Sequence, residues 1–91
     1  MSLMKIFLVE DNELYAKATK HHLSLNPDNQ VEHFVTGKSC LEKLYLQPDC
    51  ILLDYSLPDL SGIDVLKKVK SSQPDLPVVI VSGQEDVATA I

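Results

Sequence analysis

Residues 50–62 read CILLDYSLPDLSG, and this stretch decides the fold. Four apolar residues run directly into a carboxylate, Asp54, and the chain then turns through Pro58 and Gly62. Short apolar runs bounded by turn residues are typical of strands that are buried on both faces of a parallel sheet. The stretch therefore predicts a buried strand that holds Asp54 rigidly at its carboxyl end.

Strand patterns and helix patterns alternate along the rest of the chain. The order predicts one doubly wound α/β domain, a parallel sheet covered by helices on both faces. Strands are expected over 5–9, 31–35, 50–53 and 78–81. Helices are expected to begin at Asn12, after Gly37, near Gly62, and between Gln84 and Asp86. The apolar helix positions expected to face the core are Leu14, Tyr15, Ala18, Leu25, Leu41, Leu44, Tyr45, Ile63, Leu66 and Val69.

Length and composition exclude several classes of protein. The 91 residues suffice for one domain, and the net charge of −5 argues against direct contact with nucleic acid by this segment. No apolar stretch approaches the ~20 residues of a membrane helix. Cys40 and Cys50 show no metal-binding spacing and fit buried thiols in a reducing cytoplasm. Residues 1–3 precede a second methionine and are given no weight, as a remnant of expression.

Acidic residues follow two of the predicted strands. Glu10 and Asp11 end the first strand, Asp54 ends the third, and Ser82 follows the fourth. Each acid alone also fits a turn or a helix cap. In a parallel sheet, however, ligands bind outside the carboxyl ends of the strands, where these side chains would meet. Clustered carboxylates oppose one another's ionisation unless a hard cation such as Mg²⁺ binds. The pattern predicts a metal-assisted phosphoryl site with Asp54 as the nucleophile.

From Lys5 to Ile91 the chain resembles the receiver domain of bacterial two-component response regulators. The acidic pair, the hydroxyl of Ser82 before a small residue and a D-x-x-L-P-x-x-x-G pattern carry this resemblance; the pattern is formed by Asp54, Leu57, Pro58 and Gly62. The resemblance implies the flavodoxin-like strand order 2-1-3-4-5. Residues 82–91 also resemble the start of the fourth helix in receivers that precede a sigma-54-activating ATPase, which implies a role in transcription regulation.

The resemblance also implies roles for individual residues. Asp54 would accept a phosphoryl group from a histidine kinase in a cytoplasmic phosphorelay. The domain would catalyse only its own phosphorylation and dephosphorylation. Mg²⁺ would bind Asp11 directly, Glu10 through water, Asp54, and the backbone carbonyl of Ser56. The hydroxyl of Ser82 would sense the phosphoryl group, and the side chains of Ser56 and Gln84 would tune dephosphorylation.

The sequence departs from the family pattern at its end. A receiver has a fifth strand and a fifth helix, with a lysine and a switch aromatic that no residue here matches. The exposed edge expected on the fourth strand invites pairing with another chain. We expect either a chain that stops within its fourth helix or a homodimer completed by strand or helix exchange.

Other functions on the same fold fit less well. A flavin or nucleotide binder is disfavoured, because the first loop is acidic and no glycine-rich cradle is present. An aspartyl-phosphate phosphatase is disfavoured, because Ser56 stands where that class has a second acid. A non-phosphorylated pseudo-receiver that acts as a protein-interaction module remains the open alternative.

Overall fold

Strands and helices alternate along the chain, as the sequence predicts. The computed structural model describes residues 3–81 and 87–90. In chain order the elements are β1 (Met4–Val9), α1 (Glu13–Ser24), β2 (Asn29–Phe34), α2 (Gly37–Glu42), the 3-10 helix η1 (Leu44–Leu46), β3 (Cys50–Asp54), α3 (Gly62–Ser72), β4 (Val78–Val81) and β5 (Val87–Ala90). The sheet order is β2-β1-β3-β4-β5, with the first four strands parallel. The doubly wound α/β class and the strand order 2-1-3-4 are thereby confirmed.

The three α-helices begin where the sequence supplies a capping side chain. Asn12 caps α1, Thr36 caps α2 and Ser61 caps α3, and each side-chain oxygen accepts a hydrogen bond from a backbone N–H in the first turn. Such caps satisfy donors that the helix itself leaves unpaired. The caps place each helix start directly after the loop that follows a strand.

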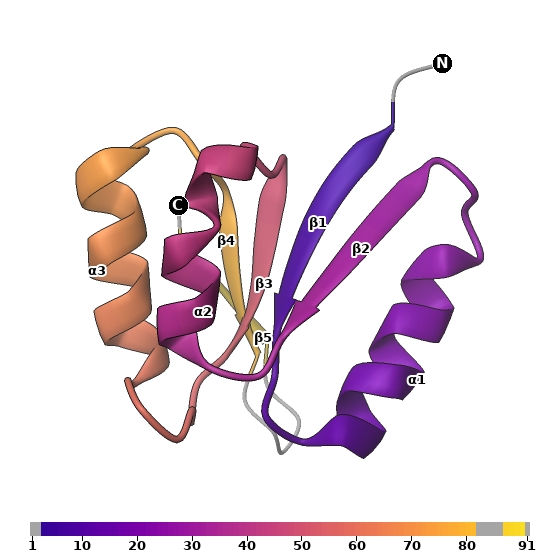
Figure 1. Ribbon diagram of the computed structural model, residues 1–91, viewed down its shortest axis with the longest axis horizontal. Helices are drawn as coiled ribbons and strands as arrows, with labels where there is room; N and C mark the ends of the chain where they lie inside the picture. Colours follow the sequence, from indigo (N-terminus) through magenta and orange to yellow (C-terminus); the bar gives the residue numbers. More distant parts are fainter. Residues whose placement is uncertain (1–2, 82–86, 91) are drawn as a thin grey trace.

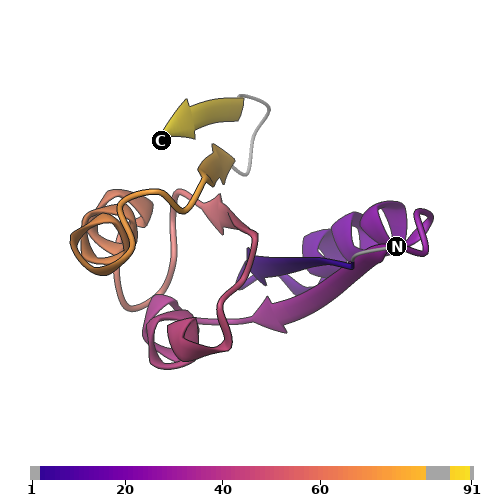
Figure 2. The same cartoon turned by 90° about the horizontal axis from the view of Figure 1, so that it is seen from above.

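Helices cover the two faces of the sheet unequally. α2 and α3 lie together on one face, and α1 lies on the opposite face beside β2 (Figures 1 and 2). Side chains alternate between the faces along each strand. Those on the α2 and α3 face join the main core cluster, which includes Phe7, Val9, Ile51, Leu53, Val65, Val69, Val78 and Ile80. The main hydrophobic core therefore lies between the sheet and the α2–α3 pair.

The predicted core face of α1 is wrong. Leu14, Tyr15 and Leu25 are 80%, 53% and 66% exposed, and Ala18 is exposed as well. The helix instead turns Ala16 inward, with Thr19 and Leu23 half-buried along the same face. These three positions also follow helical spacing, so periodicity allowed two phases. The small side chain of Ala16 lets the helix lie close to the sheet.

Two details of the other helices differ from expectation as well. Tyr45 lies in η1 and is 69% exposed, because the helix tightens after Lys43 and turns this side chain outward. On α3, Val65 is fully buried where Ile63 was expected, and Ile63 is 37% exposed. Leu66 is partly buried and Val69 fully buried, as predicted.

Residues after β4 differ from the predicted fourth helix. Gln84 to Asp86, where that helix was expected to begin, lie outside the described residues. Val87–Ala90 form β5, a strand antiparallel to β4, with Val79 opposite Thr89. This hairpin supplies partners to the backbone groups on the outer edge of β4. The expected free edge of the fourth strand is therefore wrong for this structure, since a segment of the same chain pairs with it.

In the described part of the chain, no helix has the length and apolar character required to cross a membrane.

Candidate functional site

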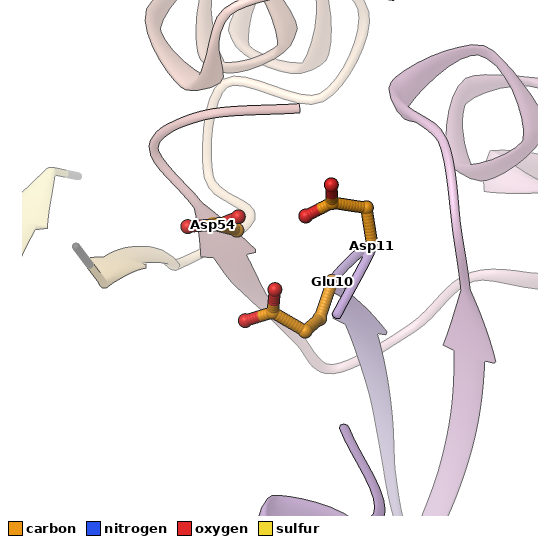
Figure 3. A group of neighbouring side chains, drawn as sticks. All are labelled: Glu10, Asp11 and Asp54. Carbon is orange, nitrogen blue, oxygen red and sulfur yellow. The ribbon is translucent and has the colours of Figure 1, made fainter. Parts of the chain in front are cut away.

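Three carboxylates meet at the carboxyl ends of two neighbouring strands. Glu10 and Asp11 directly follow β1, and Asp54 is the last residue of β3, which pairs with β1 in parallel. Carboxylate oxygens of the three residues all lie within 4.8 Å of one another. Figure 3 shows the three side chains pointing toward a shared space. The convergence predicted from the sequence is therefore present.

Buried strands and backbone hydrogen bonds hold these acids in place. Asp54 is only 7% exposed, and the residue before it, Leu53, is fully buried in the core. The backbone N–H of Glu10 donates to the carbonyl of Phe34 at 2.9 Å, and Nε2 of His33 lies 2.7 Å from the carbonyl oxygen of Glu10. The acidic pair is thus anchored to β2 as well as to β1.

Burial and mutual repulsion disfavour ionisation in the cluster. Desolvation, together with the nearby charges of Asp54 and Asp11, raises the pKa of Glu10 to about 7. Desolvation also raises the pKa of Asp54, to which the charge of Asp11 adds. A bound cation would reverse both effects, because it favours the ionised forms. Hard oxygen ligands grouped in this way suit Mg²⁺.

Residues 55–61, which we call the acceptor loop, connect Asp54 to α3. Gly62 N–H donates to the carbonyl of Tyr55 at 2.8 Å, and Ser56 forms an isolated bridge with Ser61. A Cβ on Gly62 would lie 2.9 Å from the carbonyl oxygen of Asp54, so glycine is required for this closure. The loop is therefore closed at its base directly beside Asp54.

Two of the predicted site residues lie outside the part of the chain that the structure describes. Ser82 and Gln84 fall in the segment 82–86, so their expected roles stay predictions. Val81, the residue before Ser82, is described: its carbonyl accepts a hydrogen bond from the N–H of Tyr55 at 3.0 Å. The end of β4 therefore lies against the start of the acceptor loop.

Sequence reasoning missed two side chains that bear on the site. The carboxylate of Asp59, in the acceptor loop, accepts hydrogen bonds from the N–H groups of Gly37 and Lys38 in α2. The ring of His33, in β2, contacts the carbonyl of Glu10. Both contacts join residues more than twenty positions apart in the chain. The sequence offered one signal for Asp59: it is an acid that lies inside the D-x-x-L-P-x-x-x-G pattern.

A family model, that of the response regulator receiver domain, matches residues 6–91. The chain belongs to this family. The chain is 35% identical over 85 residues to the regulatory protein LuxO of Vibrio cholerae, covering 92% of this chain and 18% of that protein. It is 44% identical over 57 residues to the luminescence regulatory protein LuxO of Vibrio campbellii, covering 62% of this chain and 13% of that protein.

Solved receiver domains share the fold. The CheY-like receiver of Methanospirillum hungatei superimposes with a TM-score of 0.83 at 28% identity, covering 93% of this chain and 68% of that one. The non-phosphorylated HemR receiver domain of Leptospira biflexa gives 0.79 at 31% identity, covering 89% and 65%. Receiver domains are phosphoacceptor signalling domains that work with histidine kinases, and the family normally binds Mg²⁺ at acidic residues like those grouped here.

Proposed function

We propose that this receiver accepts a phosphoryl group from a histidine kinase on Asp54, in a reaction that requires Mg²⁺. The observation that carries the proposal is the placement of Asp54. The residue is 7% exposed at the tip of β3, and one of its carboxylate oxygens lies within 4.8 Å of an oxygen of Glu10 and of Asp11. A rigid carboxylate nucleophile beside other oxygen ligands is the arrangement that phosphoryl transfer requires.

The transfer exchanges one bond to phosphorus for another. A carboxylate oxygen of Asp54 attacks the phosphorus, the phosphorus–nitrogen bond of the phosphohistidine breaks, and the imidazole nitrogen leaves. The product is an acyl phosphate on Asp54. Asp11, Asp54 and the backbone carbonyl of Ser56 would hold the metal directly, and Glu10 would hold it through water. Mg²⁺ supplies charge neutralisation for the transferring group.

The switch and the output are the finer parts of this proposal. The hydroxyl of Ser82 would approach the phosphoryl oxygens and report the modified state to the segment after β4. The hydrogen bond between Tyr55 N–H and the carbonyl of Val81 supports this route, because it ties the acceptor loop to the residue before Ser82. Relatives named as regulatory proteins, one of them as a transcriptional regulatory protein, support a transcription regulator as the parent protein. Its sigma-54-activating type and its cytoplasmic location are proposed from the family resemblance of the sequence, residues 82–91 included.

Intact mass tests the acceptor. The purified chain is incubated with acetyl phosphate, with Mg²⁺ or with a chelator. We expect a gain of one phosphoryl group that requires Mg²⁺, is lost in Asp54→Asn, and is retained in Asp75→Asn, which removes an exposed carboxylate of the same kind. Hydroxylamine should release the group, since it cleaves acyl phosphates.

The pseudo-receiver alternative gives a different result. If the folded chain gains no mass under any of these conditions, the phosphoacceptor proposal is wrong and an interaction module is favoured. If Asp54→Asn gains the same mass as the unchanged chain, the phosphoryl group resides on another residue.

A further inference from the structure

The carboxylate of Asp59 joins the acceptor loop to a helix that follows a different strand. Asp59 Oδ1 accepts a hydrogen bond from the N–H of Gly37 at 3.0 Å, and Oδ2 accepts one from the N–H of Lys38 at 2.9 Å. Gly37 and Lys38 are the first two residues of α2, which follows β2. Both oxygens of one exposed carboxylate are therefore used in a contact across about twenty residues of chain.

Among the residues that the structure describes, Asp59 is the only one whose side chain accepts hydrogen bonds from these two donors. Thr36, the N-cap of α2, accepts from the N–H of Ser39. The N–H groups of the first turn have no partner within the helix itself, so a carboxylate there is favourable. Backbone hydrogen bonds, those of Lys38 and Gly37 before those within the loop itself, outweigh desolvation and keep the pKa of Asp59 below its usual value, so the carboxylate is ionised at neutral pH.

Close packing keeps α2 within reach of the loop. A Cβ on Gly37 would lie 2.6 Å from Cγ2 of Val65 in α3 and 3.4 Å from Cδ1 of Leu60 in the acceptor loop. The start of α2 therefore lies directly against the loop and the helix that follows it. The loop is closed at its base by Gly62 and Tyr55, and Asp59 fixes its far end.

We propose that Asp59 is a positioning residue for cation binding: by tying the acceptor loop to α2, it holds the backbone carbonyl of Ser56 where the metal needs it. Ser56 lies in the same loop, three residues before Asp59, and its backbone is constrained at Ser61. The inference rests on the proposed function, because it takes Ser56 as a metal ligand. It adds a residue outside the acidic cluster on which Mg²⁺ affinity depends.

Mg²⁺ titration of the full chain by ¹⁵N-NMR tests this role without requiring phosphorylation. Removing a partner that orients a metal ligand typically lowers affinity by roughly 10–100-fold. Asp59 acts through the loop backbone, so we expect about a threefold to tenfold loss in Asp59→Ala. Asp59→Asn should lose less, since its amide oxygen still accepts one bond. Asp64→Asn is the matched control: it removes the same charge from an exposed position in the first turn of α3.

A second readout separates positioning from mere folding. In the unchanged chain, Mg²⁺ should shift the amide resonances of Gly37 and Lys38, and this shift should vanish in Asp59→Ala. If Asp59→Ala does not fold, Asp59→Asn carries both measurements.

The outcomes are distinct. Folded Asp59 variants that bind Mg²⁺ as tightly as Asp64→Asn would overturn the inference and leave the proposed function standing. An unchanged chain that binds no Mg²⁺ would overturn both.

Discussion

Asp54 shows why a buried carboxylate in a cluster of acids needs a positive charge to compensate for it. Its strand buries it to 7% exposure, and two further acids lie within 4.8 Å. Without a cation, burial and the repulsion between the carboxylates favour the protonated form, so the pKa of Glu10 rises to about 7. The site is therefore prepared for a positive charge before one binds.

This arrangement predicts how stability changes with pH. The pKa of Glu10 rises from 4.5 to about 7 on folding, so between these values the folded chain binds more protons than the unfolded chain. The free energy of unfolding should then fall as pH rises through this window in the presence of a chelator. Urea denaturation at several pH values measures it. Saturating Mg²⁺ should remove much of the fall.

Glu10→Gln is the variant that checks the cause, since it cannot ionise. Its stability should depend less on pH between about 5 and 7 than that of the unchanged chain. The pKa of Asp59 is lowered, which has the opposite effect on stability, but that effect is confined to pH values below about 3.8, the ordinary pKa of an aspartate. Equal pH dependence in Glu10→Gln and the unchanged chain would show that another group carries the proton.

At the scale of single elements, the junction between β3 and α3 is the most constrained. A Cβ at Gly62 would meet the backbone of Asp54 and Tyr55 at 2.9 and 3.0 Å, whereas a Cβ at Gly37 would meet the side chain of Val65 at 2.6 Å. Neither glycine has positive φ, so alanine is allowed at both positions by backbone conformation. Only the neighbouring atoms distinguish the two sites.

Gly62→Ala should therefore be the more damaging change. Backbone atoms cannot move aside, and we expect a loss of ~1–3 kcal/mol in the free energy of unfolding together with weaker Mg²⁺ binding. At Gly37 a shift of Val65 relieves the contact, and the lower entropy of the unfolded chain offsets part of the loss by ~0.4–1 kcal/mol. Urea denaturation of both variants gives the comparison. A Gly37→Ala chain less stable than Gly62→Ala would contradict it.

The start of α3 and two of its inward residues, Leu66 and Val69, could be predicted from sequence, but the burial of Val65 could not. The turn residues around Pro58 and Gly62 mark where the helix begins, and Gln73 with the following proline marks its end. The inward face was placed on Ile63, whereas Val65 is fully buried. Both Ile63 and Val65 fit helical periodicity with Leu66 and Val69, and Val65 is the one that packs in the core, beside Gly37 of α2.

The strand β5 yields a test at the same scale. A short apolar segment after β4 fits either helix or strand from sequence, and pairing with the edge of β4 favours the strand. We expect cross-strand NOEs between the backbones of Val79 and Thr89, which lie opposite each other. Sequential amide NOEs typical of a helix over 87–90 would show instead that the predicted fourth helix forms.

In the whole molecule, the alternation of strand and helix segments predicted the structure better than the spacing of apolar residues within the helices did. The acids at the ends of β1 and β3 converge because parallel neighbours bring their carboxyl ends to one edge. The contact of Asp59 with α2 could not be predicted, since it depends on how two loops after different strands approach each other. Local sequence patterns therefore located the acidic cluster. The contact that holds the neighbouring loop depends on tertiary packing, which such patterns do not contain.

The unequal covering of the sheet gives the last prediction. Leu52 and Leu53 are neighbours on β3 and point to opposite faces. Leu53 is fully buried in the core formed with α2 and α3, whereas Leu52 is half-buried and, by this alternation, lies on the face that carries α1. Leu53→Ala should lower the free energy of unfolding by ~2–5 kcal/mol, because it leaves a cavity in a packed core. Leu52→Ala should lower it by less than about 1.5 kcal/mol, since water already reaches part of the side chain. Urea denaturation with Mg²⁺ present measures both. Equal losses would mean that the α1 face of β3 is as fully covered in solution as the opposite face.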